Sequence, residues 1–273
     1  VPLIAGYGSR PVPSPFRRVA IHCHCTDYFI SRPRRPETAK IRGMHRPPSA
    51  DNIAKLLQRV RLSAEKSQRQ TSDIVVLAVS KTRPPADIRA AYAAGLSQFG
   101  ESYLQEALGK MAELGDLPLT WHFIGPIQSN KTRSIAAHFD WVHSVDREKI
   151  ARRLSEQRPE RMAPLQVCLQ VNISGESSKS GVSPEALPDL ARAVAGLPRL
   201  QLRGLMAIPA ATGDAVAQHR AFARLRQALQ ALQPAIAGLD TLSMGMSADL
   251  EAAIAEGSTI VRVGTAIFGS RDR

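Results

Sequence analysis

Short apolar runs alternate with helical stretches along the chain from residue 72 to the C-terminus. This alternation predicts βαβ units and a parallel sheet. Eight apolar runs in about 200 residues match the strand count of a (β/α)8 barrel. The expected strands are Ile74–Val79, Ser97–Gly100, Thr120–Gly125, Trp141–Ser144, Leu165–Asn172, Gln201–Ile208, Thr241–Gly245 and Thr259–Gly264.

Residues that start and stop helices stand between these runs. Ser183 precedes Pro184, as an N-cap does when proline occupies the first helical position. Gly95, Gly196 and Gly257 stand where helices are expected to end. The expected helices are Pro85–Ala94, Leu104–Leu114, Asn130–His138, Arg147–Glu156, Pro184–Ala195, Asp214–Leu232 and Ala248–Glu256, with a further helix at residues 49–68 before the barrel.

The fold class is therefore α/β, and two architectures compete. An open, doubly wound sheet is disfavoured, because no G-x-G-x-x-G follows the first strand and no break divides the chain into halves. We expect a TIM barrel with an extra N-terminal helix, formed by residues 44–273 as a single domain. An apolar content of 44% is enough to bury its core. No run reaches 18 apolar residues, so no membrane helix is expected.

Residues 1–43 differ from the rest of the chain. They hold six prolines and follow no helical or strand period, so we expect a disordered extension. Met44 follows directly, and we expect it to be the natural start, with the preceding segment a mis-assigned extension. The run HCHC at residues 22–25 has metal-ligand residue types, but no second cluster completes four ligands, so no metal site is expected.

Charge and cysteine content limit the partners and the location. The formal net charge is +12, but residues 1–43 hold eight Lys or Arg and only two Asp or Glu residues. The rest of the chain is therefore mildly basic, which argues against nucleic acid as a partner. Three unevenly spaced cysteines fit a reducing cytoplasm rather than a disulfide framework.

A barrel carries its chemistry at the C-terminal ends of its strands, and Lys81 follows the first expected strand. A lysine at a sheltered barrel mouth loses solvation, which lowers the pKa of its amine and makes it a nucleophile for carbonyl compounds. The alternative is a lysine that caps the strand and extends to water. Lys81 alone does not decide between these roles.

The segment between Ser243 and Thr265 joins the exits of strands seven and eight, the usual phosphate site of this barrel. Ser243 and Ser247 offer hydroxyls, and Gly245 and Gly264 let a phosphate approach the backbone. A helix that starts near Ser247 would add free N–H groups and a positive dipole end. A plain N-cap is the alternative role for Ser247.

Arg262 lies in the middle of the last expected strand, in register with Ile260 and Gly264. Its side chain should therefore face the barrel interior. A buried arginine needs an acceptor. The two candidates are a carboxylate of the protein and the ring nitrogen or phosphate of a ligand.

Six motifs, in order, resemble the YggS/PROSC family of pyridoxal-phosphate-binding proteins, also called PLP homeostasis proteins. The resemblance covers about residues 50–270 and excludes the N-terminal extension. It implies a (β/α)8 barrel similar to the N-terminal domain of alanine racemase. The motifs are LAVSKT, FGESYLQE, WHFIGPIQSNK, VNISGESSKSG, GLMAIP and SMGMSADLEAAIAEGSTIVRVGTAIFG.

The resemblance also implies a cofactor, pyridoxal 5′-phosphate (PLP), and the residues that hold it. Lys81 matches the lysine that binds PLP as a Schiff base, and Arg262 matches the arginine that faces the pyridine nitrogen. Met206 and Met244 match positions near the ring, and Asn172 matches a position at the mouth of the barrel. Ser247, Gly264 and Thr265 match phosphate-binding positions, and Ser243 lies beside them.

Ser102 departs from the family pattern. The family usually reads Phe-Gly-Glu-Asn-Tyr after the second strand, and serine replaces the asparagine here. Loss of one neutral hydrogen bond costs roughly 1 kcal/mol, which is too little to abolish a covalently held cofactor.

Three functions are compatible with these residues. One is a non-catalytic PLP-binding protein of vitamin B6 homeostasis, the second a PLP-dependent racemase-like enzyme, and the third a Schiff-base aldolase without PLP. Racemisation by two bases needs a second acid/base, which alanine racemase takes from a C-terminal domain. The sequence ends at Arg273, soon after the last strand, so we expect no such domain. The aldolase leaves Arg262 and the phosphate site without a shared purpose. We therefore expect a carrier, monomeric or weakly dimeric, with PLP-requiring apoenzymes as partners.

Overall fold

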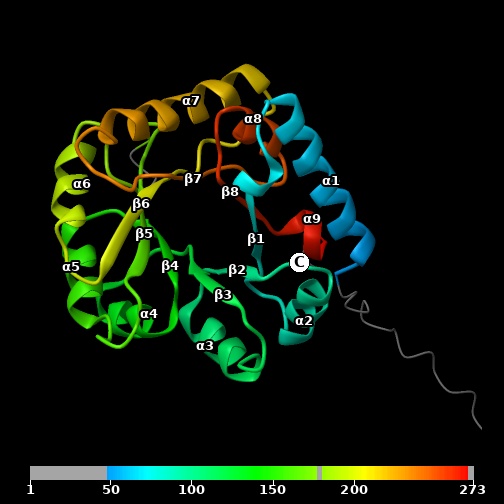
Figure 1. Ribbon diagram of the computed structural model, residues 1–273, viewed down its shortest axis with the longest axis horizontal. Helices are drawn as coiled ribbons and strands as arrows, with labels where there is room; N and C mark the ends of the chain where they lie inside the picture. Colours follow the sequence, from blue (N-terminus) through cyan, green and yellow to red (C-terminus); the bar gives the residue numbers. More distant parts are fainter. Residues whose placement is uncertain (1–47, 177–179, 270–273) are drawn as a thin grey trace, which may run out of the picture. The chain divides into compact units, whose positions relative to one another are not determined.

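Parallel strands close into a barrel in chain order, with β1 hydrogen-bonded to β8 (Figure 1). This architecture is seen in a computed structural model that describes residues 48–176 and 180–269. The expected extension at residues 1–43, with its HCHC run, and Met44 lie outside the described residues. The strands are β1 Val75–Val79, β2 Gln98–Glu101, β3 Thr120–Phe123, β4 Trp141–Val145, β5 Leu165–Gln170, β6 Leu200–Met206, β7 Thr241–Ser243 and β8 Ile260–Val263.

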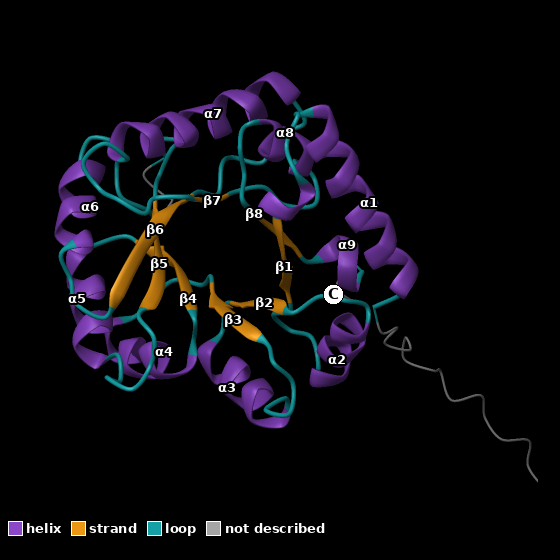
Figure 2. Cartoon of the chain, in the orientation of Figure 1, coloured by secondary structure: helices purple, strands orange, loops and turns teal. Residues whose placement is uncertain are grey.

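Helices surround the barrel and cover the outer faces of its strands (Figure 2). Their inward faces are apolar and pack on the strands in one continuous core. The expected TIM barrel is therefore confirmed. The helices are α1 Ala50–Lys66, α2 Pro85–Ala93, α3 Leu104–Glu113, α4 Thr132–His138, α5 Glu148–Gln157, α6 Leu187–Ala195, α7 Ala215–Leu232, α8 Leu250–Ala255 and α9 Thr265–Phe268, with short 3-10 turns at Thr71–Asp73 and Ser129–Lys131.

The expected extra helix is α1, which lies beside α8 on the side of the barrel where β8 and β1 meet (Figure 1). Ser49 caps it by accepting a hydrogen bond from the N–H of Asp51 at 3.2 Å. Ile53, Leu56 and Val60 are buried at helical spacing and form its packing face. The helix therefore closes the seam between the first and last strands.

Several element boundaries differ from the expectation by one to three residues, and two of them have a clear local cause. The helix expected from Pro184 begins at Leu187, because Pro184 lies in a turn that Ser183 closes with a hydrogen bond from the N–H of Ala186. The strand expected to reach Gly245 ends at Ser243, and Gly245 adopts a φ of +93°. A Cβ at Gly245 would lie 2.5 Å from the Cβ of Ala253, so packing against α8 already requires glycine there.

Polar side chains occupy part of the barrel interior. His122, His143, Ser243 and Arg262 are all buried there. The interior of a TIM barrel is usually filled by branched apolar side chains. Because these four side chains are polar and buried, each requires hydrogen-bond partners within the protein.

Candidate functional site

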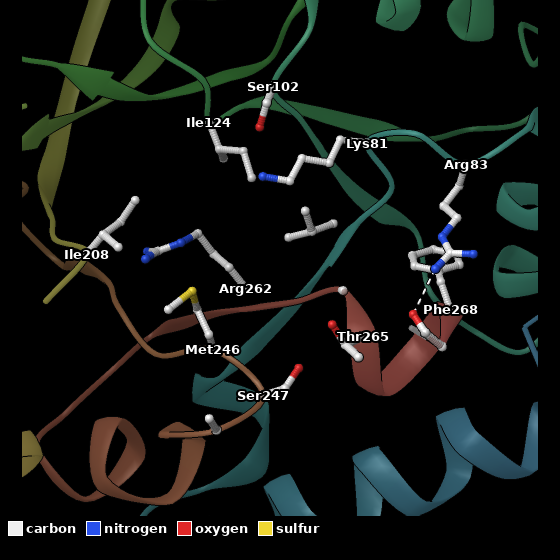
Figure 3. Close-up of a pocket in the computed structure, with 14 residues that line it drawn as sticks. Lys81, Arg83, Ser102, Ile124, Ile208, Met246, Ser247, Arg262, Thr265 and Phe268 are labelled. Carbon is white, nitrogen blue, oxygen red and sulfur yellow. Dashed lines mark hydrogen bonds between the residues drawn. The ribbon is translucent and has the colours of Figure 1, made fainter. Parts of the chain in front are cut away.

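A cavity of about 300 Å³ opens at the C-terminal ends of the strands (Figure 3). This size is at the lower end of small-molecule sites, which span about 300 to 1,000 Å³. Five of the residues singled out from the sequence line it: Lys81, Ser247, Arg262, Gly264 and Thr265. The exits of β1, β7 and β8 thus meet at one place, as the barrel topology predicts.

Lys81 extends into this cavity from the turn that follows β1, with Ser102 beside it (Figure 3). Buried residues precede it, since Leu77, Ala78 and Ser80 are fully enclosed. Lys81 itself is half-buried. The arrangement places an amine at the wall of the cavity instead of at the open surface.

Arg262 faces the barrel interior, as its register predicts, and is 5% exposed. Its guanidinium donates to the carbonyl of Ser243 at 2.5 Å, to the Ser243 hydroxyl at 2.8 Å and to the carbonyl of Ala207 at 2.9 Å. None of these acceptors is a carboxylate. Burial lowers the pKa of Arg262 to about 10, so the group remains charged at neutral pH.

A chain of hydrogen bonds continues from Arg262 through the barrel. Ser243 Oγ lies 2.8 Å from His143 Nδ1, His143 Nε2 lies 2.9 Å from His122 Nδ1, and His122 Nε2 lies 3.0 Å from Gln98 Oε1. One set of tautomers satisfies every atom: Ser243 donates to His143, His143 to His122, and His122 to Gln98.

This direction requires both imidazoles to be neutral. Burial lowers the pKa of His122 to about 3. Burial, with the neighbouring His122 and the charge of Arg262, lowers the pKa of His143 well below its ordinary value. The groups that accept hydrogen bonds from the guanidinium are therefore neutral, and the Asp249 carboxylate acts on it through space, raising the pKa of Arg262 against the larger effect of burial.

Ser247 and Thr265 lie across the cavity from Lys81 (Figure 3), and Gly264, which precedes Thr265, also lines the cavity. The helix expected to begin at Ala248 begins instead at Leu250, because the Asp249 carboxylate accepts the N–H of Met246 at 2.6 Å and holds the preceding residues in a turn. Asp249, not Ser247, occupies the N-cap position. Neither the plain N-cap role of Ser247 nor a helix starting at that residue is observed.

The other four predicted residues do not line the cavity. Ser243 is buried beneath Arg262, and Met206 and Met244 are 1% and 0% exposed within the packed interior. Asn172 lies at the exit of β5, where its amide donates to the carbonyl of Glu176 at 2.8 Å. Ser243 thus acts on the cavity through Arg262, whereas Asn172 holds its own loop.

Several lining residues were missed from the sequence. Arg83 donates to the carbonyl of Gly269 at 2.7 Å, and its guanidinium lies 5.9 Å from the ring centre of Phe268. Its position two residues after Lys81 was the feature of the sequence that could have identified Arg83 as a lining residue. Ile124, Ile208 and Met246 add apolar surface at strand exits where polar residues were sought.

Ser102, the departure from the family pattern, lines the cavity. Its backbone is held tightly, since a Cβ at Gly125 would lie 2.3 Å from the carbonyl oxygen of Ser102. The position of the side chain at the cavity wall is therefore set by the packing of two loops, and serine presents less polar surface there than asparagine.

Two negative findings apply to the described parts of the chain. No group of three or more His, Cys, Asp or Glu side chains there could hold a metal ion. No helix within residues 48–176 and 180–269 is long and apolar enough to cross a membrane.

The fold corresponds to a known class. The family model described as the alanine racemase N-terminal domain matches residues 52–272. Alanine racemase from Corynebacterium glutamicum superposes with a TM-score of 0.64 at 17% identity, covering 82% of this chain and 63% of that one. At this identity the likeness shows the fold alone.

Closer relatives define the particular family. The pyridoxal phosphate homeostasis protein of Pseudomonas aeruginosa is 67% identical over 223 residues, covering 82% of this chain and 96% of that protein. The protein of the same name from Escherichia coli K12 is 51% identical over 226 residues, covering 82% and 97%. The chain belongs to the family of the pyridoxal phosphate homeostasis proteins.

Solved structures agree with this assignment. PipY of Synechococcus elongatus without PLP matches with a TM-score of 0.71 and 42% identity, covering 81% of this chain and 99% of PipY. PipY with PLP bound matches with a TM-score of 0.69 and 41% identity over the same shares.

Proposed function

We propose that this chain binds PLP in the barrel-mouth cavity, attaches it to Lys81 as a Schiff base, and serves PLP homeostasis without catalysing a reaction of its own. The observation that carries the proposal is the convergence of three kinds of group on one cavity: the amine of Lys81, the guanidinium of Arg262, and the hydroxyls of Ser247 and Thr265. The printed names of the relatives and the PLP-bound PipY structure support the same reading.

The described residues fit the chemistry of this cofactor. PLP carries an aldehyde, a pyridine nitrogen and a phosphate. An amine is the partner of an aldehyde, and hydroxyls and backbone near Gly264 suit a phosphate. A Cβ at Gly264 would make an ordinary contact with Val79, 3.4 Å from its carbonyl oxygen, so packing alone does not require glycine there.

Arg262 fits the pyridine nitrogen because it remains a charged donor and never accepts a proton back. A nitrogen that receives such a hydrogen bond stays unprotonated, which makes the ring a weaker electron sink when PLP is bound. Racemases use the same device, so this property does not by itself separate a carrier from the racemase-like alternative.

The residues that line the cavity favour the carrier over the racemase-like alternative. Among the described residues that line it, Lys81, Arg83 and Arg262 are the only ionisable side chains. A guanidinium donates hydrogen bonds and has no acceptor site, so neither arginine is suited to act as a general base. A two-base racemisation would need a further acid/base on the face opposite Lys81.

The test is PLP retention, measured as the visible absorption of the protein after incubation with PLP and gel filtration. We expect the wild type and the surface control Lys55→Ala to retain PLP, and Lys81→Ala to lose the retained absorption. Equal retention by Lys81→Ala would overturn the attachment site and direct attention to Lys179, which lies outside the described residues. Robust amino-acid racemisation that depends on Lys81 would overturn the carrier function.

Three finer statements remain predictions under this proposal. PLP-requiring apoenzymes are the expected recipients of the cofactor, the expected location is the cytoplasm, and the expected state is a monomer or weak dimer.

A further inference from the structure

We propose that Lys110, together with Glu101 and Glu106, forms a clamp that positions Lys81, and we call these three residues the turn clamp. The inference rests on the proposed function in one respect, since it takes Lys81 to be the attachment residue. It adds three positioning residues that do not line the cavity.

Lys110 is a buried ammonium with a complete set of acceptors. It donates to the carbonyl of Ser80 at 2.7 Å, to Glu101 Oε1 at 2.7 Å and to Glu106 Oε1 at 2.5 Å. Its side chain is 5% exposed, and that of Glu101 is fully buried. Three donors meet three acceptors, so the ammonium is held in one orientation.

The clamp reaches the residues on both sides of Lys81. Before it, Ser80 gives its carbonyl to Lys110 and donates its hydroxyl to Glu101 Oε1 at 2.7 Å. After it, the N–H of Thr82 donates to Glu106 Oε1 at 2.6 Å. The backbone that carries Lys81 is thus fixed at its two ends by one charged cluster.

The turn needs such support because its backbone is strained. Thr82 has a φ of +65°, in the left-handed region that a β-branched residue rarely adopts. Residues hold such conformations only where surrounding contacts impose them, and they concentrate at functional sites. Glu106 supplies that contact directly, through the N–H of the strained residue.

The cost of the cluster indicates a purpose beyond stability. Burial raises the pKa of Glu101, and the ammonium of Lys110 opposes that rise only in part. A buried ion pair is often no more stabilising than apolar residues of the same size. Lys110 lies on the same face of α3 as the buried Leu104 and Ala107, where an apolar residue would suffice for packing. We infer that the charges are used for directional control of the turn.

The experiment uses Glu106, because its side chain is 29% exposed and its loss leaves the buried Glu101–Lys110 pair intact. The variants are Glu106→Ala, the conservative Glu106→Gln, whose amide oxygen still accepts from Thr82, and the exposed control Asp116→Asn. The apo-proteins are mixed with PLP, reduced with borohydride at timed intervals, and the pyridoxyl on Lys81 is quantified by mass spectrometry. Binding of pyridoxine 5′-phosphate, which has no aldehyde, is measured in parallel.

We expect Glu106→Ala to slow modification of Lys81 by about tenfold, because misplacement of a reacting group by a fraction of an ångström has effects of this order. Glu106→Gln should recover most of the rate, and Asp116→Asn should match the wild type. Binding of pyridoxine 5′-phosphate should change less than about twofold, since the phosphate wall is untouched.

Two results would overturn the inference alone: an unchanged rate in Glu106→Ala, or parallel losses of rate, pyridoxine 5′-phosphate binding and melting temperature, which indicate a general structural role. A wild type that is not modified on Lys81 would instead overturn the proposed function, and this inference with it.

Discussion

The two walls of the cavity are held by opposite electrostatic means. On the lysine wall, the turn after β1 is tied to α3 by an ammonium and two carboxylates. On the arginine wall, Arg262 is held by carbonyls, a hydroxyl and a chain of neutral histidines. The groups that fix the backbone of the turn are charged, whereas the groups that accept hydrogen bonds from the ligand-facing guanidinium are neutral.

The difference follows from what each wall presents. A buried cluster of one ammonium and two carboxylates gives the turn a defined geometry. A buried guanidinium without a carboxylate partner keeps its hydrogen-bonding capacity and field for an electron-rich group. The following changes act on one wall at a time, from the largest expected effect to the smallest.

Removing the ammonium of the turn clamp should have the largest effect. Lys110→Met leaves Glu101 buried without its counter-charge, which we expect to lower the free energy of unfolding by about 3 to 5 kcal/mol. Urea denaturation of the apo-protein measures this. The exposed pair Arg61–Glu65 is the control, and Arg61→Met should cost at most about 1 kcal/mol. Similar losses of unfolding free energy in both variants would mean that the buried pairs of the turn clamp contribute no more to stability than an exposed pair.

The histidine chain of the arginine wall should make stability depend on pH. His122 and His143 have pKa values below the ordinary value in the folded state, with His122 at about 3, so the unfolded chain binds more protons below pH 6.5. The free energy of unfolding should therefore fall as the pH drops from 6.5 toward 3, by up to about 1.4 kcal/mol per pH unit for each histidine.

Urea denaturation between pH 7.5 and pH 5 checks this slope. His143→Gln should reduce it, whereas the exposed control His138→Gln should leave it unchanged. Stability that rises on acidification, or a slope insensitive to His143, would contradict the neutral chain.

Loss of the guanidinium should weaken cofactor binding more than folding. Arg262→Met removes the charged donor facing the cavity, and a hydrogen bond to a charged group contributes about 1.5 to 3 kcal/mol, so we expect PLP affinity to fall roughly 10- to 100-fold. Equilibrium dialysis gives the dissociation constant. Arg203→Met, which breaks an exposed pair with Asp240 at the other end of the barrel, is the matched control. Equal PLP affinities of the Arg262→Met and Arg203→Met variants would mean that Arg262 does not contribute to PLP binding.

Restoring the family residue at position 102 should have the smallest effect. Ser102→Asn adds one neutral hydrogen-bonding group to the lysine wall, so PLP affinity should rise by no more than about fivefold, or roughly 1 kcal/mol. The exposed Ser97→Asn, which precedes β2, is the control. A change much larger than this would mean that Ser102 alters the geometry of Lys81.

The sequence predicted the barrel and the inward direction of Arg262, because both depend on local periodicity and register. The start of α8 could not be placed, since Asp249 stabilises a turn by accepting from Met246, and a carboxylate at that position fits a helix cap equally well. Lys110 was missed because two of its three partners, Ser80 and Glu101, lie at the exits of β1 and β2. The presence of a lysine on the apolar face of α3 was the feature of the sequence that could have indicated a buried and paired side chain.

The central claim is that the two walls serve one cofactor, held on one lysine. The most direct test is peptide mapping of the protein after incubation with PLP and reduction with borohydride. We predict pyridoxyl on Lys81 and on no other lysine at stoichiometric level. Stoichiometric modification of another lysine, or a protein that takes up no PLP, would contradict it.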